Sequence, residues 1–364
     1  MTVDTVCHWM EEIAPLSLQE NYDNAGLQIG DRNCEVTGVL LTLDVTEAVI
    51  DEAISKKCNL IIAHHPLLFK GLKQITGNNY VQRCVIAAIR NNIAIYAAHT
   101  NMDNIAAGVS QKMAEKLTLQ HCQVLSPRTD QLFKLITYVP LSKSDDVREA
   151  LFEAGAGTIG NYDACSFNAE GIGTFRANKG AHPFVGNLYE RHHEKETRIE
   201  VIVSAFQRAA IEKALLETHP YEEPAYDWIP LRNRSSQIGL GIVGNLTEPE
   251  TEKAFLQRLK ETFCLSVIRH TPFCGKPIQK VALCGGSGAS LLPAALGTQA
   301  DIYISADFKY HEFFDADNRI IIADIGHYES EQFTKELLQE QLQKKMPTFA
   351  LHLSTSLTNP VQYF

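Results

Sequence analysis

The chain has 364 residues, of which 45% are hydrophobic and 21% charged, and its formal net charge is −10. This length accommodates two or three domains with a sizeable core, and the acidic balance argues against a nucleic-acid-binding protein, which needs a basic face. No apolar run is long enough for a membrane span and the N-terminus lacks a basic-then-apolar signal pattern, so we expect a cytoplasmic protein with no membrane partner.

The first third of the chain alternates between strand and helix patterns. Hydrophobic periodicity predicts helices at 3–13, 47–56 and 79–90, strands at 38–43, 60–63 and 93–98, and a further helix that ends near residue 117. Asp44 or Thr46 would cap the helix that begins at Glu47. This β–α–β–α alternation predicts a parallel sheet covered by helices.

The pattern changes near Pro127. From about residue 133 the order becomes strand, helix, strands, helix, strand, which is typical of a ferredoxin-like α+β fold. We therefore predict that residues 128–236 form a domain inserted into an α/β domain built from 1–127 and 237–364. His192 and His193 lie in a charged run within the insert that we interpret as a solvated loop.

The last third returns to the pattern of the first. It predicts helices at 249–262 and up to about 345, and strands at 280–283, 302–305 and 320–323. The predicted fold class is thus a two-lobed α/β domain with helix-covered, largely parallel sheets, interrupted by the α+β insert. The glycine-rich stretch at 285–288 is interpreted as a tight turn or as a phosphate cradle, although it lacks the Lys-Ser/Thr ending of a P-loop.

Three predicted strand ends carry side chains that can ligate a metal ion. They are His64 with His65, His99 with Asp103, and His327 with Glu331. Adjacent histidines after a strand point to opposite sides, and so can serve two ions. A spacing of four at a helix start places both side chains on one face.

The kind of ligand narrows the choice of metal. Imidazole and carboxylate ligands suit Zn, Mn, Fe, Co or Ni, and nine cysteines without a C-x-x-C pair predict reduced thiols rather than a thiolate site. A carboxylate that bridges two ions roughly 3.5–4 Å apart would create a bound hydroxide beside a Lewis-acid pair, the usual arrangement for metal-assisted hydrolysis.

Each of these residues also has a structural interpretation. Asp103 can act as an N-cap, Glu331 can face a helix dipole, and His99 can be a hydrogen-bonded core histidine. His311, which follows Asp307 by four residues, can bind substrate, shuttle protons or only pack.

Seven stretches together resemble the NGG-interacting-factor-three-like dinuclear metal-centre family, whose members are often labelled type-two GTP cyclohydrolase homologues. The stretches are Asp23-Asn24-x-Gly26-Leu27, His64-His65-Pro66, His99-Thr100-Asn101-Met102-Asp103, Gly239-Leu240-Gly241-Ile242-Val243-Gly244, Gly285-Gly286-Ser287-Gly288, Ala306-Asp307-Phe308-Lys309-Tyr310-His311 and Gly326-His327-Tyr328-x-Ser330-Glu331. They cover roughly residues 1–125 and 237–364, the two halves of the outer domain.

The resemblance implies a ligand set and an assembly. The ligands of two divalent ions would be His64, His65, Asp103, His327 and Glu331. Glu331 would bridge the ions, and His99 would touch substrate or a ligand. The insert looks like a PII/CutA-like domain, and the usual assembly is a toroidal homohexamer with metal sites facing an internal cavity. Two departures are Tyr22, where a tryptophan is expected, and Ile242, where a common arginine would have helped to hold an anionic substrate.

The leading hypothesis for function is a di-metal hydrolase in which a metal-bound hydroxide attacks a phosphoester, an amide or a purine ring carbon. The substrate would be small and anionic or nucleotide-like, and the candidate catalytic residues are His99, His311 and Glu331. The alternative is a non-catalytic hexamer that regulates partners or handles metal and senses a small effector through the insert. A nucleic-acid-binding ring is disfavoured by the charge of −10.

Overall fold

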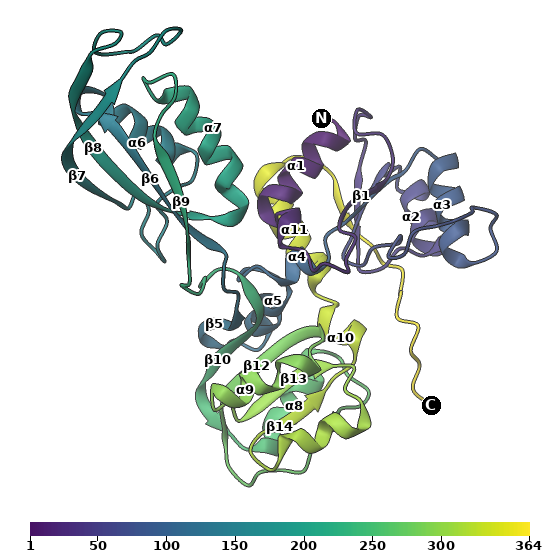
Figure 1. The fold of residues 1–364 in the computed structure, drawn as a ribbon. Helices are drawn as coiled ribbons and strands as arrows, with labels where there is room; N and C mark the ends of the chain where they lie inside the picture. The colour runs from purple at the N-terminus through teal and green to yellow at the C-terminus, as the bar shows by residue number, and fades with distance from the viewer. The chain divides into compact units, whose positions relative to one another are not determined.

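The computed structural model describes residues 1–364, and the chain divides into two compact units (Figure 1). The first unit combines Met1–Pro127 with Gln237–Phe364, and the second is the intervening segment Arg128–Ser236. Each unit has sheets and apolar cores of its own, and each is described by itself. None of the helices combines the length and the apolar character that a membrane crossing requires.

The first sheet of the first unit contains β1 (Gly26–Ile29), β2 (Val39–Thr42), β3 (Leu60–Ala63), β4 (Ala94–Ala97) and β15 (Leu351–Leu353). The order across the sheet is β1-β4-β3-β2-β15, in which only the β1–β4 pair is antiparallel. Every residue of β2, β3 and β4 is buried, as expected for strands covered on both faces. The prediction of a helix-covered parallel sheet is confirmed here.

Four helices cover the two faces of this sheet, namely α1 (Val3–Ile13), α2 (Glu47–Ser55), α3 (Tyr80–Arg90) and α11 (Thr334–Lys345). Neighbouring residues of β2 serve different cores, since Leu41 packs with α1 and α11, whereas Leu40 packs with α2 and α3. Figure 1 shows α11, in yellow, beside α1, in purple, so segments from the two ends of the chain share one core.

The second sheet of this unit contains β5 (Gln120–Pro127), β10 (Gly239–Glu250), β11 (Arg269–His270), β12 (Ile278–Ser287), β13 (Ile302–Ala306) and β14 (Ile321–Asp324). The order is β11-β14-β13-β12-β10-β5. Strands β12, β13 and β14 are parallel, whereas the other pairings are antiparallel, so this sheet is mixed rather than largely parallel. Phe255 from α8 (Glu252–Thr262) packs on one face and Leu292 from α9 (Leu292–Gly297) on the other.

The second unit has the elements β6 (Leu132–Pro140), α6 (Ser144–Glu153), β7 (Ser166–Arg176), β8 (Arg191–Ser204), α7 (Arg208–Thr218) and β9 (Tyr226–Leu231). They form an antiparallel sheet in the order β7-β8-β6-β9. Val147 of α6 and Ile211 of α7 share a core with Leu135 and Val201 of the sheet. The relation to PII and CutA proteins stays a prediction.

Several local predictions need correction. His192 and His193 are not in a loop, because β8 begins at Arg191 and pairs them with Phe175 and Thr174 of β7. The helix expected at 249–262 begins at Glu252, where the Thr251 side chain accepts a hydrogen bond from the Ala254 N–H.

The helix expected to reach residue 117 is broken into α4 (Thr100–Asp103) and α5 (Val109–Lys116). The break lies near Gly108, where a Cβ atom would stand 1.9 Å from the carbonyl oxygen of Met102, so only glycine fits there. The remaining elements are α10 (His327–Glu331) and the 3-10 turns η1 (Leu16–Leu18), η2 (Leu141–Lys143), η3 (Ala205–Gln207), η4 (Ala289–Leu291) and η5 (Tyr310–Ala316).

The insert has a hydrophobic core of its own, so a core mutation there should destabilise the insert and leave the first unit unchanged. Leu215 is fully buried in that core, so Leu215→Ala should lower the free energy of unfolding of the insert by about 2–5 kcal/mol. The adjacent Leu216 is 48% exposed, and Leu216→Ala should change it by no more than about 0.5 kcal/mol. Hydrogen exchange followed by mass spectrometry measures this by peptide, and equal loss of protection in the first unit after Leu215→Ala would contradict the prediction.

Candidate metal centre

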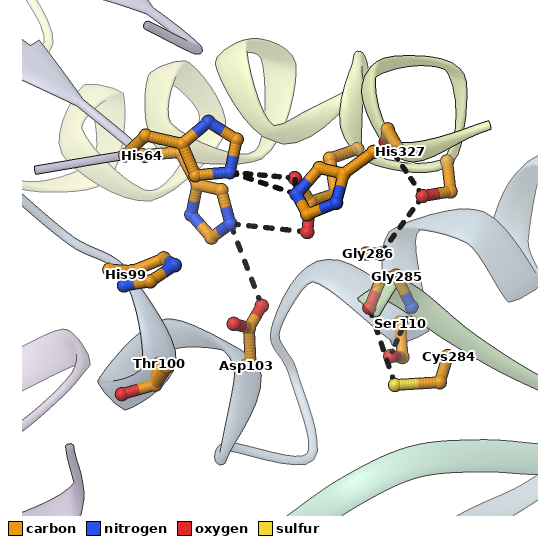
Figure 2. A network of polar contacts seen from close by, with 12 residues as sticks. His64, His99, Thr100, Asp103, Ser110, Cys284, Gly285, Gly286 and His327 are labelled. Carbon is orange, nitrogen blue, oxygen red and sulfur yellow. Dashed lines mark hydrogen bonds and ion pairs between the residues drawn. The ribbon is translucent and has the colours of Figure 1, made fainter. Parts of the chain in front are cut away.

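Imidazoles and carboxylates from both sheets of the first unit converge at the carboxyl ends of β3, β4 and β14 (Figure 2). The ends of parallel strands bring such side chains to one edge of a sheet. Three groups have ligand atoms that all lie within 4.8 Å of one another. The groups are His64, His65 and His99; His65, His327 and Glu331; and His64, Asp103 and Glu331.

The His64 ring has a defined tautomer. Its Nδ1 lies 2.7 Å from the carbonyl oxygen of Ala98, and because a carbonyl only accepts hydrogen bonds, Nδ1 must carry the hydrogen. In the neutral ring, Nε2 therefore presents a lone pair. This atom is buried and has no hydrogen-bond partner, so it is oriented as a ligand.

The other three imidazoles are each held by an aspartate through Nδ1. The contacts are His65 to Asp44, His99 to Asp23 and His327 to Asp307, each 2.7 Å long. This arrangement fixes the ring orientation and leaves Nε2 for the cluster, as in the carboxylate–histidine pairs that support metal ligands. Figure 2 shows His64 and His327 on opposite sides of the cluster, and Nε2 of His327 lies 3.3 Å from Nε2 of His65.

The sequence pattern alone did not predict these three supporting aspartates. Asp44 was considered only as a helix cap, although Thr46 accepts the capping hydrogen bond from Val49. Asp307 was considered only in relation to His311. Asp44 lies two residues after the end of β2, and Asp307 directly follows β13. The histidines also follow strand ends, and this shared position was the signal available in the sequence.

Glu331 lies at the centre of the cluster and is only 3% exposed. Its Oε2 is 3.0 Å from Nε2 of His65 and 3.2 Å from Nε2 of His327, and its Oε1 is 3.6 Å from Nε2 of His64. Asp103 completes the group formed with His64 and Glu331, and its Oδ1 lies 3.8 Å from Nε2 of His64. One carboxylate is thus shared by two sets of ligands.

The glycine-rich stretch is explained by this carboxylate. A Cβ atom on Gly286 would lie 2.2 Å from Oε1 of Glu331, and the Gly286 N–H donates to the Ser330 hydroxyl at 2.9 Å. Strand β12 continues to Ser287, with irregular pairing to β13 between Leu283 and Ser287, so only Gly288 of the stretch lies in the turn that leads to η4. The stretch allows close approach of the strand to Glu331.

Burial and nearby charged groups shift the pKa values of the ligand side chains. Burial alone would lower the pKa of His65, but the hydrogen bond to Asp44 and the nearby Glu331 carboxylate raise it to about 10. The pKa of His327 rises to about 9, because Glu331 and Asp307 outweigh its burial. Burial opposes ionisation of Glu331, yet His64 and the other imidazoles hold its pKa well below the usual value. Burial, together with the neighbouring Glu331, raises the pKa of Asp103.

The donor set fits a divalent cation. Three buried atoms of the cluster lack a hydrogen-bond partner, namely His64 Nε2, Asp103 Oδ1 and Glu331 Oε2. Burying a polar atom without a partner costs free energy unless a bound group satisfies it. Nitrogen and carboxylate oxygen suit Zn, Mn, Fe, Co or Ni. Burial raises the pKa of Cys284 to about 12, so this neighbouring sulfur stays a thiol and adds no thiolate ligand.

Two expectations about spacing have different outcomes. His327 and Glu331 share a group, because α10 begins at His327 and places residues four apart on one face. His99 and Asp103 share none of the three groups, because His99 precedes α4 with φ −107° and ψ −116°, outside helical geometry. A common ion for His99 and Asp103 stays a prediction of their spacing. His311 is exposed in η5 and belongs to no group.

A pocket of about 580 Å³ adjoins the cluster on the side of His65 and His327. Its other lining residues include Arg269, Tyr328 and Tyr363. The pocket gives a small molecule access to the exposed side of the ligand set.

Removing the shared carboxylate should abolish metal binding. We expect Glu331→Gln to weaken the affinity for divalent ions by more than about 100-fold, because it deletes the charge that both ligand sets share. The control is Glu336→Gln, a more exposed glutamate that pairs with Lys116 and should keep the wild-type metal content. Elemental analysis after reconstitution measures both variants, and wild-type metal in Glu331→Gln would contradict the assignment.

Metal binding should release protons. His65 and His327 are protonated in the metal-free protein at neutral pH, since their pKa values are raised to about 10 and about 9. A metal ion needs the unprotonated Nε2 atoms, so filling the site should release protons and the affinity should strengthen as the pH rises towards 9. Calorimetry in buffers of different ionisation enthalpy counts the protons. An affinity independent of pH between 6 and about 9 would contradict this.

The comparisons with known proteins cover the whole chain. The family described as Duf34/NIF3 (NGG1p interacting factor 3) matches residues 1–360. A relative from Halalkalibacterium halodurans named "GTP cyclohydrolase 1 type 2 homolog" is 41% identical over 93% of this chain and 92% of its own length. A relative of the same name from Bacillus subtilis is 39% identical over 91% of this chain and 89% of its own length. The crystal structure of a Bacillus cereus protein related to NIF3 superposes with a TM-score of 0.88 at 37% identity, covering 100% of this chain and 99% of that one. The chain therefore belongs to the DUF34/NIF3 family.

Proposed function

We propose that the protein is a metal-dependent hydrolase whose site is the cluster around Glu331. The observation that carries the proposal is a buried carboxylate shared by two ligand groups, with the Nδ1 atoms of the imidazoles already engaged. His65, His327 and Glu331 would hold one ion, and His64, Asp103 and Glu331 the other. When bound, two ions would supply Lewis acidity and lower the pKa of water.

His99 is the residue best placed to move a proton. Its Nδ1 is held by Asp23, and its ring lies beside both His64 and His65, with centroids 5.4 Å and 5.5 Å away. Its side chain is 17% exposed, so it can meet a substrate. The Asp23 carboxylate, whose pKa is lowered to about 2 by His99 and Thr100 against the effect of its burial, stays ionised and orients the ring.

The pocket supports a small anionic or nucleotide-like substrate. Arg269 is 54% exposed, donates through Nη1 to Asp324 and through Nη2 to the Phe308 carbonyl oxygen, and retains further N–H groups for an anion. Tyr328 and Tyr363 offer ring surface to a base or another flat group. The name of the relatives supports GTP as the first substrate to test. The homohexameric assembly stays a prediction of the resemblance.

The test is a hydrolysis screen with protein reconstituted with Zn, Mn, Fe, Co or Ni, using GTP, phosphoesters and amides. We expect metal-dependent turnover of one substrate class, its loss in Glu331→Gln together with the metal, and a loss of about 10²–10⁴-fold in kcat for His99→Gln with metal retained. Metal binding without turnover of any substrate would contradict the hydrolase and favour the non-catalytic, metal-handling alternative.

A further inference from the structure

The insert contains a cavity of about 1040 Å³ that the metal chemistry does not involve. It lies over the end of the β7–β8 hairpin, and its walls come from the chain after β7 and from the segment around Tyr221. Glu196 of β8 lines the cavity. Ile199 and Val201 lie on the opposite face of the same strand and pack in the core shared with α6 and α7. The volume suits a drug-sized organic molecule.

A buried carboxylate lies at the base of this cavity. Glu196 is 8% exposed, and its Oε1 accepts a hydrogen bond of 2.8 Å from the Tyr221 hydroxyl. Its Oε2 has no protein donor. Strand β7 leaves room for that oxygen, because a Cβ atom on Gly173 would lie 2.1 Å from it. A carboxylate oxygen held in this way needs a donor from a ligand or from solvent.

Aromatic rings surround the same place. The ring of Tyr221 lies 6.0 Å from that of Phe175 and 6.4 Å from that of Phe184, measured between centroids, and all three residues line the cavity. Burial and the Glu196 carboxylate raise the pKa of Tyr221, so its hydroxyl stays a neutral donor. Aromatic faces beside a carboxylate attract organic cations.

None of the positive side chains that line the cavity is paired with the Glu196 carboxylate. Arg198 pairs with Glu200 at 2.8 Å, and Arg176 and Lys179 are exposed. The remaining acidic lining residues, Glu170, Glu222 and Glu223, are exposed as well. The one charge that folding buries in this cavity is therefore negative.

We propose that this cavity binds a small organic cation with an aromatic or apolar body. Its amine or other N–H⁺ group donates to Glu196, and its body lies against Phe175, Phe184 and Tyr221. The site is formed within the insert alone, so binding is independent of the metal centre and of the hydrolase proposal.

The test uses three probes that share an indole ring and differ in charge. Isothermal titration calorimetry on the full chain compares tryptamine, a cation, with neutral tryptophol and anionic indole-3-acetate. We expect saturable binding of tryptamine, at least about tenfold tighter than that of tryptophol, because only the amine forms a charged hydrogen bond with Glu196. Indole-3-acetate should bind more weakly than both.

Two variants with one matched control locate the site. Glu196→Gln keeps the shape of the side chain and should remove the preference for tryptamine over tryptophol. Glu217→Gln, at an exposed position of α7 outside the cavity lining, should keep that preference. Phe184→Ala, in an exposed loop position, should weaken tryptamine binding several-fold even if Glu196→Gln fails to fold. All three should keep the wild-type metal content.

Three results would overturn the proposal. They are the absence of saturable tryptamine binding to the wild type, equal affinity for tryptamine and tryptophol, and an unchanged preference in folded Glu196→Gln. Since metal content is measured on the same samples, failure of this site is distinct from failure of the metal centre.

Discussion

Burial of the Glu331 carboxylate is the constraint on which the rest of the centre depends. A carboxylate at 3% exposure is expensive to remove from water, and the cost is offset only where opposite charge or good donors surround it. Here three imidazoles approach through Nε2, and β12 comes close because Gly286 has no side chain. In the metal-free protein, protons on His65 and His327 supply the opposing charge. A divalent ion would replace those protons and satisfy the buried atoms that have no partner.

Rigid support of the imidazoles is the second requirement, and the fold meets it with groups from several elements. The Ala98 carbonyl oxygen holds His64, and Asp44 and Asp307 hold His65 and His327. Asp44 is itself held, since the Thr358 hydroxyl donates to its second oxygen at 2.6 Å. The C-terminal segment thereby contributes to the orientation of a ligand that lies far from it in sequence.

The two units place buried negative charge in different surroundings, and the chemistry follows from the surroundings. In the first unit the carboxylate faces imidazole nitrogens, which favours a metal ion. In the insert the Glu196 carboxylate faces aromatic rings and a phenol hydroxyl, which favours an organic cation. Each site is formed within its own unit, so each can be tested without the other.

The sequence by itself determined the features that depend on local spacing. Alternating patterns gave the parallel core of the first sheet, and the i,i+4 spacing of His327 and Glu331 places them together because a helix begins there. Only the tertiary structure decided the pairings of Asp44 with His65, Asp307 with His327 and Asp23 with His99, which are 21, 20 and 76 residues apart. It also decided the backbone at His99, which lies outside helical geometry directly before α4. Periodicity reports which face a residue occupies, whereas these contacts depend on how separate strands and loops meet in space.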